Sequence, residues 1–228
     1  MDFMTRDTPR TATTRPLRRD AERNRQRIIA AAREVFRERG FETTLDDVAH
    51  HAGLGVGTVY RRFPNKEHLV EAMLAERLDQ VAELAGKAKQ DADAWTAFQE
   101  FLWQAAELLT GDRGLHDVLL STQFGHDRVA QARDRLIPVI RDLVQRAKET
   151  GSLRADFEPE DLPLLFKMIG AVAEYTHAVA PEAWRRYVGL LMDSLRAAPG
   201  PPTPLPVPAL DIDALQCAMD QPCRTRVP

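Results

Sequence analysis

Residues 44–66 restrict the fold more than any other part of this 228-residue chain. Two short helical patterns, residues 45–52 and 56–62, are separated by Gly53, which tolerates the positive φ found at helix ends. The second pattern has a polar side that carries Thr58, Tyr60, Arg61 and Arg62. A short helix held across another, with such a side facing outward, is how helix-turn-helix proteins enter the major groove of DNA. The segment therefore predicts a DNA-reading motif.

Local signals define where these two helices begin and end. Thr44 and Asp47 have the spacing of a capping box, in which each residue satisfies a free backbone N–H of the other. Pro64 follows the second helix and prevents its continuation. Val59 and Phe63 are then expected to point inward.

Apolar residues follow helical spacing in most of the remaining chain, and no segment alternates as a strand does. The fold class is therefore predicted to be all-α. Pro138 falls inside one helix and is expected to kink or split it. The expected helices are residues 23–39, 45–52, 56–62, 66–84, 93–110, 114–122, 127–150, 159–179 and 181–197.

Charge is distributed unevenly along the chain. Residues 1–66 hold 14 Lys and Arg against 9 Asp and Glu, a net charge of +5, whereas residues 67–228 hold 17 against 25, a net charge of −8. A basic front on an acidic body suggests that only the first part approaches a polyanion. Uneven solvated charge is the alternative explanation.

Composition argues against several classes of protein. No apolar run reaches the roughly 18 residues of a membrane-spanning helix, and the Arg-rich start lacks the apolar stretch of a secretory signal. The only cysteines, Cys217 and Cys223, offer neither a disulfide framework nor a four-ligand zinc site. We therefore expect a cytoplasmic protein without a membrane partner.

Four motifs occur in a fixed order between residues 23 and 70. They are Ile28-x-x-Ala31-Ala32-x-x-Val35-Phe36, Gly40-Phe41-x-x-Thr44, Val48-Ala49-x-x-Ala52-Gly53 and Gly57-Thr58-Val59-Tyr60-x-x-Phe63-x-x-Lys66-x-x-Leu69. Each is weak alone, but the ordered set closely resembles the DNA-binding domain of the TetR family of bacterial repressors. The resemblance implies a homodimer that binds a near-palindromic double-stranded DNA operator and is released by a small-molecule effector.

The motifs and this resemblance divide the chain into four parts. Residues 1–20 are expected to be a flexible basic arm, and residues 21–66 a three-helix helix-turn-helix domain. Residues 67–197 are expected to form a C-terminal helical bundle for effector binding and dimerisation. Residues 198–228 hold 8 of the 15 prolines and predict a disordered tail, in which residues 211–219 form one or two helical turns at most.

The resemblance and the side-chain chemistry together indicate the DNA contacts. Either Arg61 or Arg62, or Val56 with Gly57, is expected to touch base edges, because Arg binds guanine through two hydrogen bonds. The positions that resemble the family's phosphate contacts are Thr44, Thr58, Tyr60 and Lys66. Two alternatives stay open: the arginines are solvated charges at a helix end, or the Tyr60 ring belongs to the core.

The arginines of the arm and the first helix allow two interpretations. They either enter an adjacent minor groove or only steer the encounter with DNA. They are Arg15, Arg18, Arg19, Arg23 and Arg25.

The resemblance also implies an effector cavity within residues 67–197. The residues expected to line it are Trp95, Phe98, Leu102, Phe124, His126, Phe166, Ile169, Glu174, Tyr175 and His177. Ordinary helix packing explains most of the apolar ones equally well, and the sequence does not resolve which face each occupies. An aromatic, mostly apolar interior indicates a small and largely apolar effector.

Neither a metal site nor an active site is expected. Glu174 and His177 have the spacing of half a di-iron site, but no second Glu-x-x-His occurs. His50 and His51 are adjacent, so they point in different directions from a helix. No cofactor and no catalytic residue are predicted, and an enzyme is an unlikely alternative. A DNA-binding dimer without an effector, or an activator, stays open.

Overall fold

The computed structural model describes residues 14–40, 43–111, 127–198, 200 and 203–220. Within these ranges the regular elements are helices, which confirms the predicted all-α class. They are α1 (Thr14–Arg39), α2 (Leu45–His51), α3 (Val56–Arg62), α4 (Lys66–Ala88), α5 (Ala94–Thr110), α7 (Asp127–Glu149), α8 (Asp161–Thr176), α9 (Ala183–Leu195) and α10 (Ile212–Asp220). None of these described helices combines the length and apolar character needed to cross a membrane.

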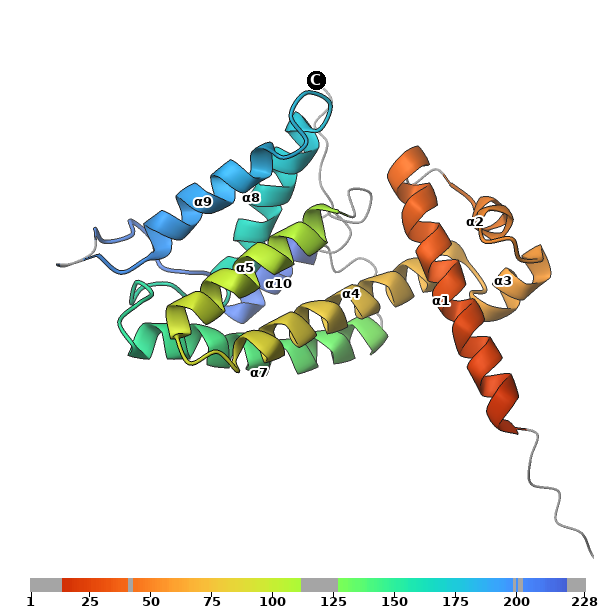
Figure 1. Ribbon diagram of the computed structural model, residues 1–228, viewed down its shortest axis with the longest axis horizontal. Helices are drawn as coiled ribbons and strands as arrows, with labels where there is room; N and C mark the ends of the chain where they lie inside the picture. Colours follow the sequence, from red (N-terminus) through yellow and green to blue (C-terminus); the bar gives the residue numbers. More distant parts are fainter. Residues whose placement is uncertain (1–13, 41–42, 112–126, 199, 201–202, 221–228) are drawn as a thin grey trace, which may run out of the picture.

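The helices form two lobes that are joined by α4 (Figure 1). Helices α1, α2 and α3 make the smaller lobe. Helix α4 runs from it into the larger lobe, where it packs along α7 and against α5. Helices α8 and α9 pack against each other and against α5. Buried apolar side chains form one continuous core through both lobes.

The smaller lobe is held together by apolar side chains from all three of its helices. Ile28 and Ala32 of α1, Val48 of α2 and Val59 of α3 have no exposed surface, and Phe63 after α3 is also buried. The predicted inward direction of Val59 and Phe63 is confirmed. Because α3 is held by this apolar face, its opposite side is left outward.

Hydrogen bonds fix the turn between α2 and α3. The predicted capping box is present: the Thr44 hydroxyl accepts from the Asp47 backbone N–H at 3.2 Å, and the Thr44 backbone N–H donates to Asp47 Oδ2 at 2.9 Å. Gly53 has a φ of +62°, a conformation that other residues rarely adopt. Arg27 Nη2 of α1 donates to the carbonyl of Ala52 at 2.9 Å and so ties the turn to the rest of the lobe.

Helix α4 belongs to both lobes. Asn65 caps its start by accepting a hydrogen bond from the His68 backbone N–H at 3.0 Å. Leu69, Val70 and Met73 follow with no exposed surface. The first half of α4 is therefore anchored by burial, and its second half lies in the larger lobe.

Ion pairs join α4 to the helices on either side of it. Arg33 Nη2 of α1 lies 2.9 Å from Glu76 Oε2, and both side chains are largely buried. Arg135 Nη2 of α7 lies 2.7 Å from Asp79 Oδ1 at an exposed site. The buried pair resists salt screening better than the exposed one does, so it contributes more to the position of α4.

Several helix boundaries differ from the prediction. Helix α8 ends at Thr176 and α9 begins at Ala183, because turns occupy most of residues 177–182. Helix α7 continues through Pro138, which is exposed, so this helix is not split. The predicted helix at residues 114–122 lies outside the described residues.

The described part of the tail contains a nine-residue helix, α10, slightly longer than the one or two helical turns that the sequence predicts at residues 211–219. Asp211 Oδ1 accepts a hydrogen bond from the Ala214 backbone N–H at 2.7 Å at its start. Leu215 is only 3% exposed because it packs against the larger lobe. A helix this short is marginal by itself, so the tertiary contact explains the difference.

Gly53→Ala is expected to lower the free energy of unfolding by about 1–2 kcal/mol, because an L residue is strained at its φ of +62°. The matched control is Gly86→Ala in α4, where an added Cβ meets nothing within 4 Å. This control should raise the stability by about 0.5–1 kcal/mol. Urea unfolding of both variants measures the two changes, and equal effects would contradict the assigned turn geometry.

Candidate nucleic-acid interface

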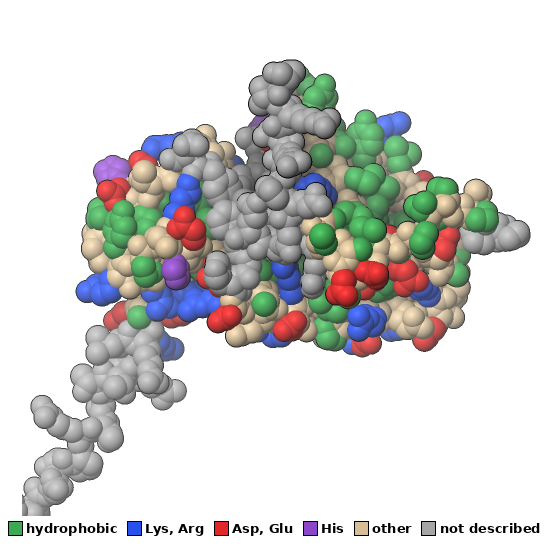
Figure 2. Space-filling view, turned by 180° about the vertical axis from the view of Figure 1, so that it is seen from behind, with side chains coloured by type: hydrophobic (Ala, Val, Ile, Leu, Met, Phe, Trp, Pro, Cys, Tyr) green, Lys and Arg blue, Asp and Glu red, His purple; other side chains and the backbone are tan. Residues whose placement is uncertain are grey.

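Helix α3 turns its polar side to the surface of the smaller lobe. Val56 and Tyr60 are each 44% exposed. The other exposed residues of α3 are Gly57, Arg61 and Arg62, whereas Thr58 is half-buried. Figure 2 shows Lys and Arg side chains gathered along the lower side of this lobe, with some acidic ones beside them. The surface is therefore basic and built on a rigid helix, as contact with phosphates requires.

The two adjacent guanidinium groups of α3 have different surroundings. Arg62 Nη2 lies 3.8 Å from Glu22 Oε2 of α1, and Arg25 Nη1 lies 3.3 Å from the other oxygen of the same carboxylate. The hydrogen bond from Gln26 is the main cause of the lowered pKa of Glu22, so this carboxylate stays charged. Arg61 has no such ion pair among the described residues. Its guanidinium is therefore the less restrained of the two.

Tyr60 on α3 is coupled to Asp46 on α2. The negative charge of Asp46 raises the pKa of the Tyr60 phenol above its ordinary value, and the phenol also hydrogen-bonds to this carboxylate. The phenol is exposed, so a phosphate that binds its hydroxyl would lie near this carboxylate. Asp46 thus puts an acidic group at the edge of the basic surface.

Thr44 and Lys66 flank the motif and also have partners within the lobe. Thr44 Oγ1 donates to Asp47 Oδ2 at 2.6 Å, and the hydrogen bonds from Thr44 are the main cause of the lowered pKa of Asp47. Lys66 Nζ lies 5.6 Å from the centroid of the Phe36 ring, which is a cation–π distance. A phosphate at Thr44 would compete with Asp47 for the hydroxyl proton.

The first helix includes part of the expected arm. Arg15 and Arg18 belong to α1, which begins at Thr14, but their side chains are not described. Arg19 is exposed, and Arg23 Nη2 lies 3.0 Å from Asp20 Oδ1. The arginines from 19 onward thus extend along the start of a helix rather than along a flexible arm.

The histidines noted in the sequence lie on the surface. His50 is exposed, and His51 Nε2 lies 2.6 Å from Glu34 Oε2 of α1. Glu174 and His177 are exposed as well. Within the described part of the chain, no three potential ligands gather in a way that could hold a metal ion.

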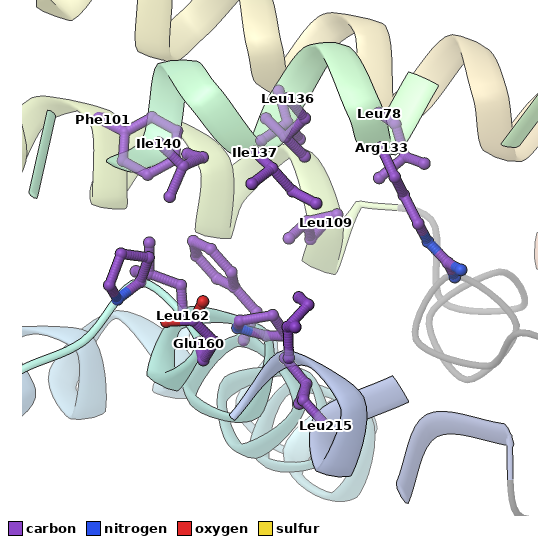
Figure 3. A pocket seen from close by; sticks show the side chains of 15 residues that line it. Leu78, Phe101, Leu109, Arg133, Leu136, Ile137, Ile140, Glu160, Leu162 and Leu215 are labelled. Carbon is purple, nitrogen blue, oxygen red and sulfur yellow. The ribbon is translucent and has the colours of Figure 1, made fainter. Parts of the chain in front are cut away.

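The larger lobe contains an apolar cavity of about 160 Å³. It lies between α4, α5, α7, α8 and α10 (Figure 3). Among the residues that the structure describes, Arg133 and Glu160 are the charged ones that line it. Its apolar lining includes Leu78, Val81, Phe101, Leu109, Leu136, Ile137, Ile140, Leu162, Phe166, Ile212 and Leu215.

The ten residues expected to line the pocket lie in four different environments. Phe166 lines the cavity. Phe98, Leu102 and Ile169 belong to the buried core without reaching the cavity, and Trp95 is half-buried between Phe98 and Arg196. Three lie on the surface: Glu174, Tyr175, which is 91% exposed, and His177. Phe124 and His126 lie outside the described residues.

Sequence reasoning missed most of the cavity because its lining is aliphatic. The α7 contribution, residues 133, 136, 137 and 140, has the spacing of one helix face. That signal was available, but it does not distinguish a cavity wall from close-packed core. The sequence predicts one or two helical turns at residues 211–219, where α10 lies, but nothing in the Pro-rich tail indicates that these turns reach the cavity.

Two sequence families match the chain. Bacterial regulatory proteins of the tetR family match residues 28–73, and the C-terminal domain of SbtR-like transcriptional regulators matches residues 93–197. The HTH-type transcriptional regulator SrpR of Pseudomonas putida is 32% identical over 160 residues. That alignment covers 65% of this chain and 72% of the relative.

Solved structures share the arrangement of both lobes. The TetR regulatory protein of Mycobacterium vanbaalenii matches with a TM-score of 0.58 and 28% identity, over 79% of this chain and 99% of that chain. A second structure, which gives the molecular basis for control of antibiotic production by a bacterial hormone, matches with a TM-score of 0.55 and 26% identity, over 77% of this chain and 98% of that chain. The chain therefore belongs to the TetR family of DNA-binding transcriptional regulators.

Proposed function

We propose that two copies of this chain bind a near-palindromic operator in the cytoplasm and repress transcription until a small, largely apolar effector releases them. The DNA-binding part of this proposal is supported by the outward side of α3. Val59 is fully buried, while Arg61 on the opposite side and Arg62 at the end of the helix are exposed. One face thus fixes the helix, and the other is available to enter the major groove.

The side chains of α3 divide into base contacts and phosphate contacts. We assign Arg61 to a base edge, because its guanidinium has no ion pair among the described residues. Val56 and Gly57 in the first turn are assigned to base edges as well, since Gly57 lets the backbone approach closely. Arg62, which lies near Glu22, is assigned to the same groove. The residues assigned to phosphates are Thr44, Thr58, Tyr60 and Lys66.

Exposed apolar side chains on α8 and α9 support a homodimer. Leu164, Met168 and Tyr175 recur at intervals of four and seven residues along one side of α8, and they are 36%, 56% and 91% exposed. Tyr187 and Leu190 on α9 are 45% and 54% exposed. Because α8 packs against α9, this dimer face suits an isologous four-helix contact with a second copy.

The cavity of the larger lobe supports regulation by an effector. It is apolar apart from Arg133 and Glu160, which favours a small apolar ligand with a polar group. The similar protein mentioned above controls antibiotic production through a bacterial hormone. This precedent and the presence of a cavity favour a ligand-responsive regulator over an effector-free one.

Helix α4 supplies a physical connection between the two sites. Leu69 and Met73 are buried beside the smaller lobe, whereas Leu78 and Val81 farther along the same helix line the cavity. An effector that displaces α4 would change the spacing of the two α3 helices in a dimer. Its effect on operator affinity cannot exceed its preference for the displaced arrangement.

Arg61→Ala is expected to weaken operator binding by roughly 1–3 kcal/mol, because a base contact is lost. An operator selected from random duplexes would be titrated with wild-type and variant protein at two salt concentrations. Arg141→Ala on α7 removes the same charge from an exposed site in the larger lobe and is the matched control. Equal affinities for Arg61→Ala and the control would refute the α3 assignment.

Asp46→Asn is expected to lower the pKa of the Tyr60 phenol toward its ordinary value, because the negative charge that raises it is removed. Absorbance titration of tyrosinate measures the change, and Tyr60→Phe identifies the transition. The same variant should bind a duplex of random sequence a few-fold more tightly at low salt, since one charge repelling phosphate is lost. An unaltered tyrosinate titration would contradict the contact between α2 and α3.

Met168→Glu is expected to convert the dimer into a monomer, because a charge would be buried in the centre of the dimer face. Light scattering during size-exclusion chromatography measures the mass. Gln131→Glu, at an exposed position of α7, adds the same charge outside that face and should leave the dimer intact. A dimeric Met168→Glu protein would exclude the proposed face.

A further inference from the structure

The C-terminal helix α10 forms part of the wall of the apolar cavity. Its residues Ile212 and Leu215 line the cavity, and Leu215 is only 3% exposed. In Figure 3, Leu215 lies across the cavity from Leu109 and Leu136. The side chain of a residue from the Pro-rich tail thus occupies space between helices of the larger lobe.

Among the side chains of α10 that the structure describes, few contact the larger lobe. Asp213, Ala214, Cys217 and Ala218 of α10 are exposed, and Leu215 is the one described residue of this helix that is buried. Burial of a single leucine stabilises the contact modestly, and a free nine-residue helix is marginally stable in water. The described contacts therefore hold α10 less strongly than the continuous core holds the long helices of the cavity wall.

The segment that leads to α10 is held at one turn of the larger lobe. Arg154 Nη2 donates to the carbonyl of Thr203 at 3.1 Å, and Arg154 Nε pairs with Asp156 Oδ1 at 2.6 Å. The backbone of Leu205 also hydrogen-bonds to Asp156, whereas the side chains of Leu205 and Val207 are exposed and add no burial. Such a tether keeps α10 at high local concentration while leaving it able to leave the cavity.

The size of the remaining space limits what fits beneath the docked helix. An apolar cavity of about 150 Å³ accommodates benzene, and the cavity here has a similar volume of about 160 Å³. The cavity is open on one side, so a larger ligand either extends out of it or displaces part of the wall. Phe101 and Leu162 lie on long helices of the continuous core, so α10 is the element that moves at the smallest energetic penalty.

We propose that α10 is a displaceable stopper, which fills the outer part of the cavity with Leu215 and leaves when an apolar ligand larger than a single aromatic ring binds. This inference rests on the proposed effector cavity and defines the size class of its ligand. The apparent affinity for a large ligand is reduced by the fraction of protein in which α10 is docked. Small ligands bind beneath the helix without that reduction.

Two neutral probes of different size test the stopper on the full-length protein. Fluorobenzene, followed by ¹⁹F NMR, represents the small class, and N-phenyl-1-naphthylamine, followed by fluorescence, represents the large class. Leu215→Ser and a chain that ends at Ala198 both remove the stopper. Each should bind the naphthylamine roughly 10- to 100-fold more tightly than the full-length wild type does, with no gain in fluorobenzene affinity.

The control is Leu210→Ser, which alters an exposed leucine of the same tail and should leave both affinities unchanged. In the wild type, saturating naphthylamine should also speed amide hydrogen exchange in residues 212–220. Equal or weaker naphthylamine binding after either change would overturn the stopper but leave the effector cavity standing. Failure of every form to bind either probe would overturn both. Operator binding by the shortened chain tests the DNA half of the proposal separately.

Discussion

The apolar face of α4 is the feature on which the rest of this structure depends. Its residues Leu69 and Met73 are buried in the core beside the DNA-binding lobe, and Leu78 and Val81 farther along the same helix line the cavity. A packed interface moves between discrete arrangements instead of deforming continuously. Because one helix is shared, the proposed displacement at the cavity would be transmitted along α4 toward α2 and α3.

Helix α3 combines a buried side that fixes its position with an outward polar side, some of whose groups already interact with other residues of the protein. The burial of Val59 fixes α3, and Asp46 of α2 lies close enough to Tyr60 for its charge to raise the pKa of the phenol. In the proposed complex Asp46 would repel phosphate and so lower the DNA affinity. This arrangement favours discrimination, because nonspecific binding depends mainly on net positive charge and base contacts depend on orientation.

The DNA-binding lobe could be predicted because its signals are local. The capping box of Thr44 and Asp47 and the glycine at residue 53 act over a few residues, so the sequence shows them directly. The residues that line the cavity could not be predicted in this way. Phe98 and Phe101 are three residues apart on α5, yet only Phe101 reaches the cavity. That difference depends on how α5 meets α7 and α8, which no short pattern encodes.

The tail is a second case in which a tertiary contact could not be predicted from a short pattern. Its helix α10 also explains how an apolar cavity is compatible with a stable protein. The sequence of the tail predicts only one or two helical turns at residues 211–219, and the docking of α10 depends on Leu215, which enters a site built by other helices. Without α10, that site would expose apolar lining to water and to other chains. A helix that covers the cavity weakly protects it when empty, and it still yields to a ligand that buries more apolar surface than Leu215 does.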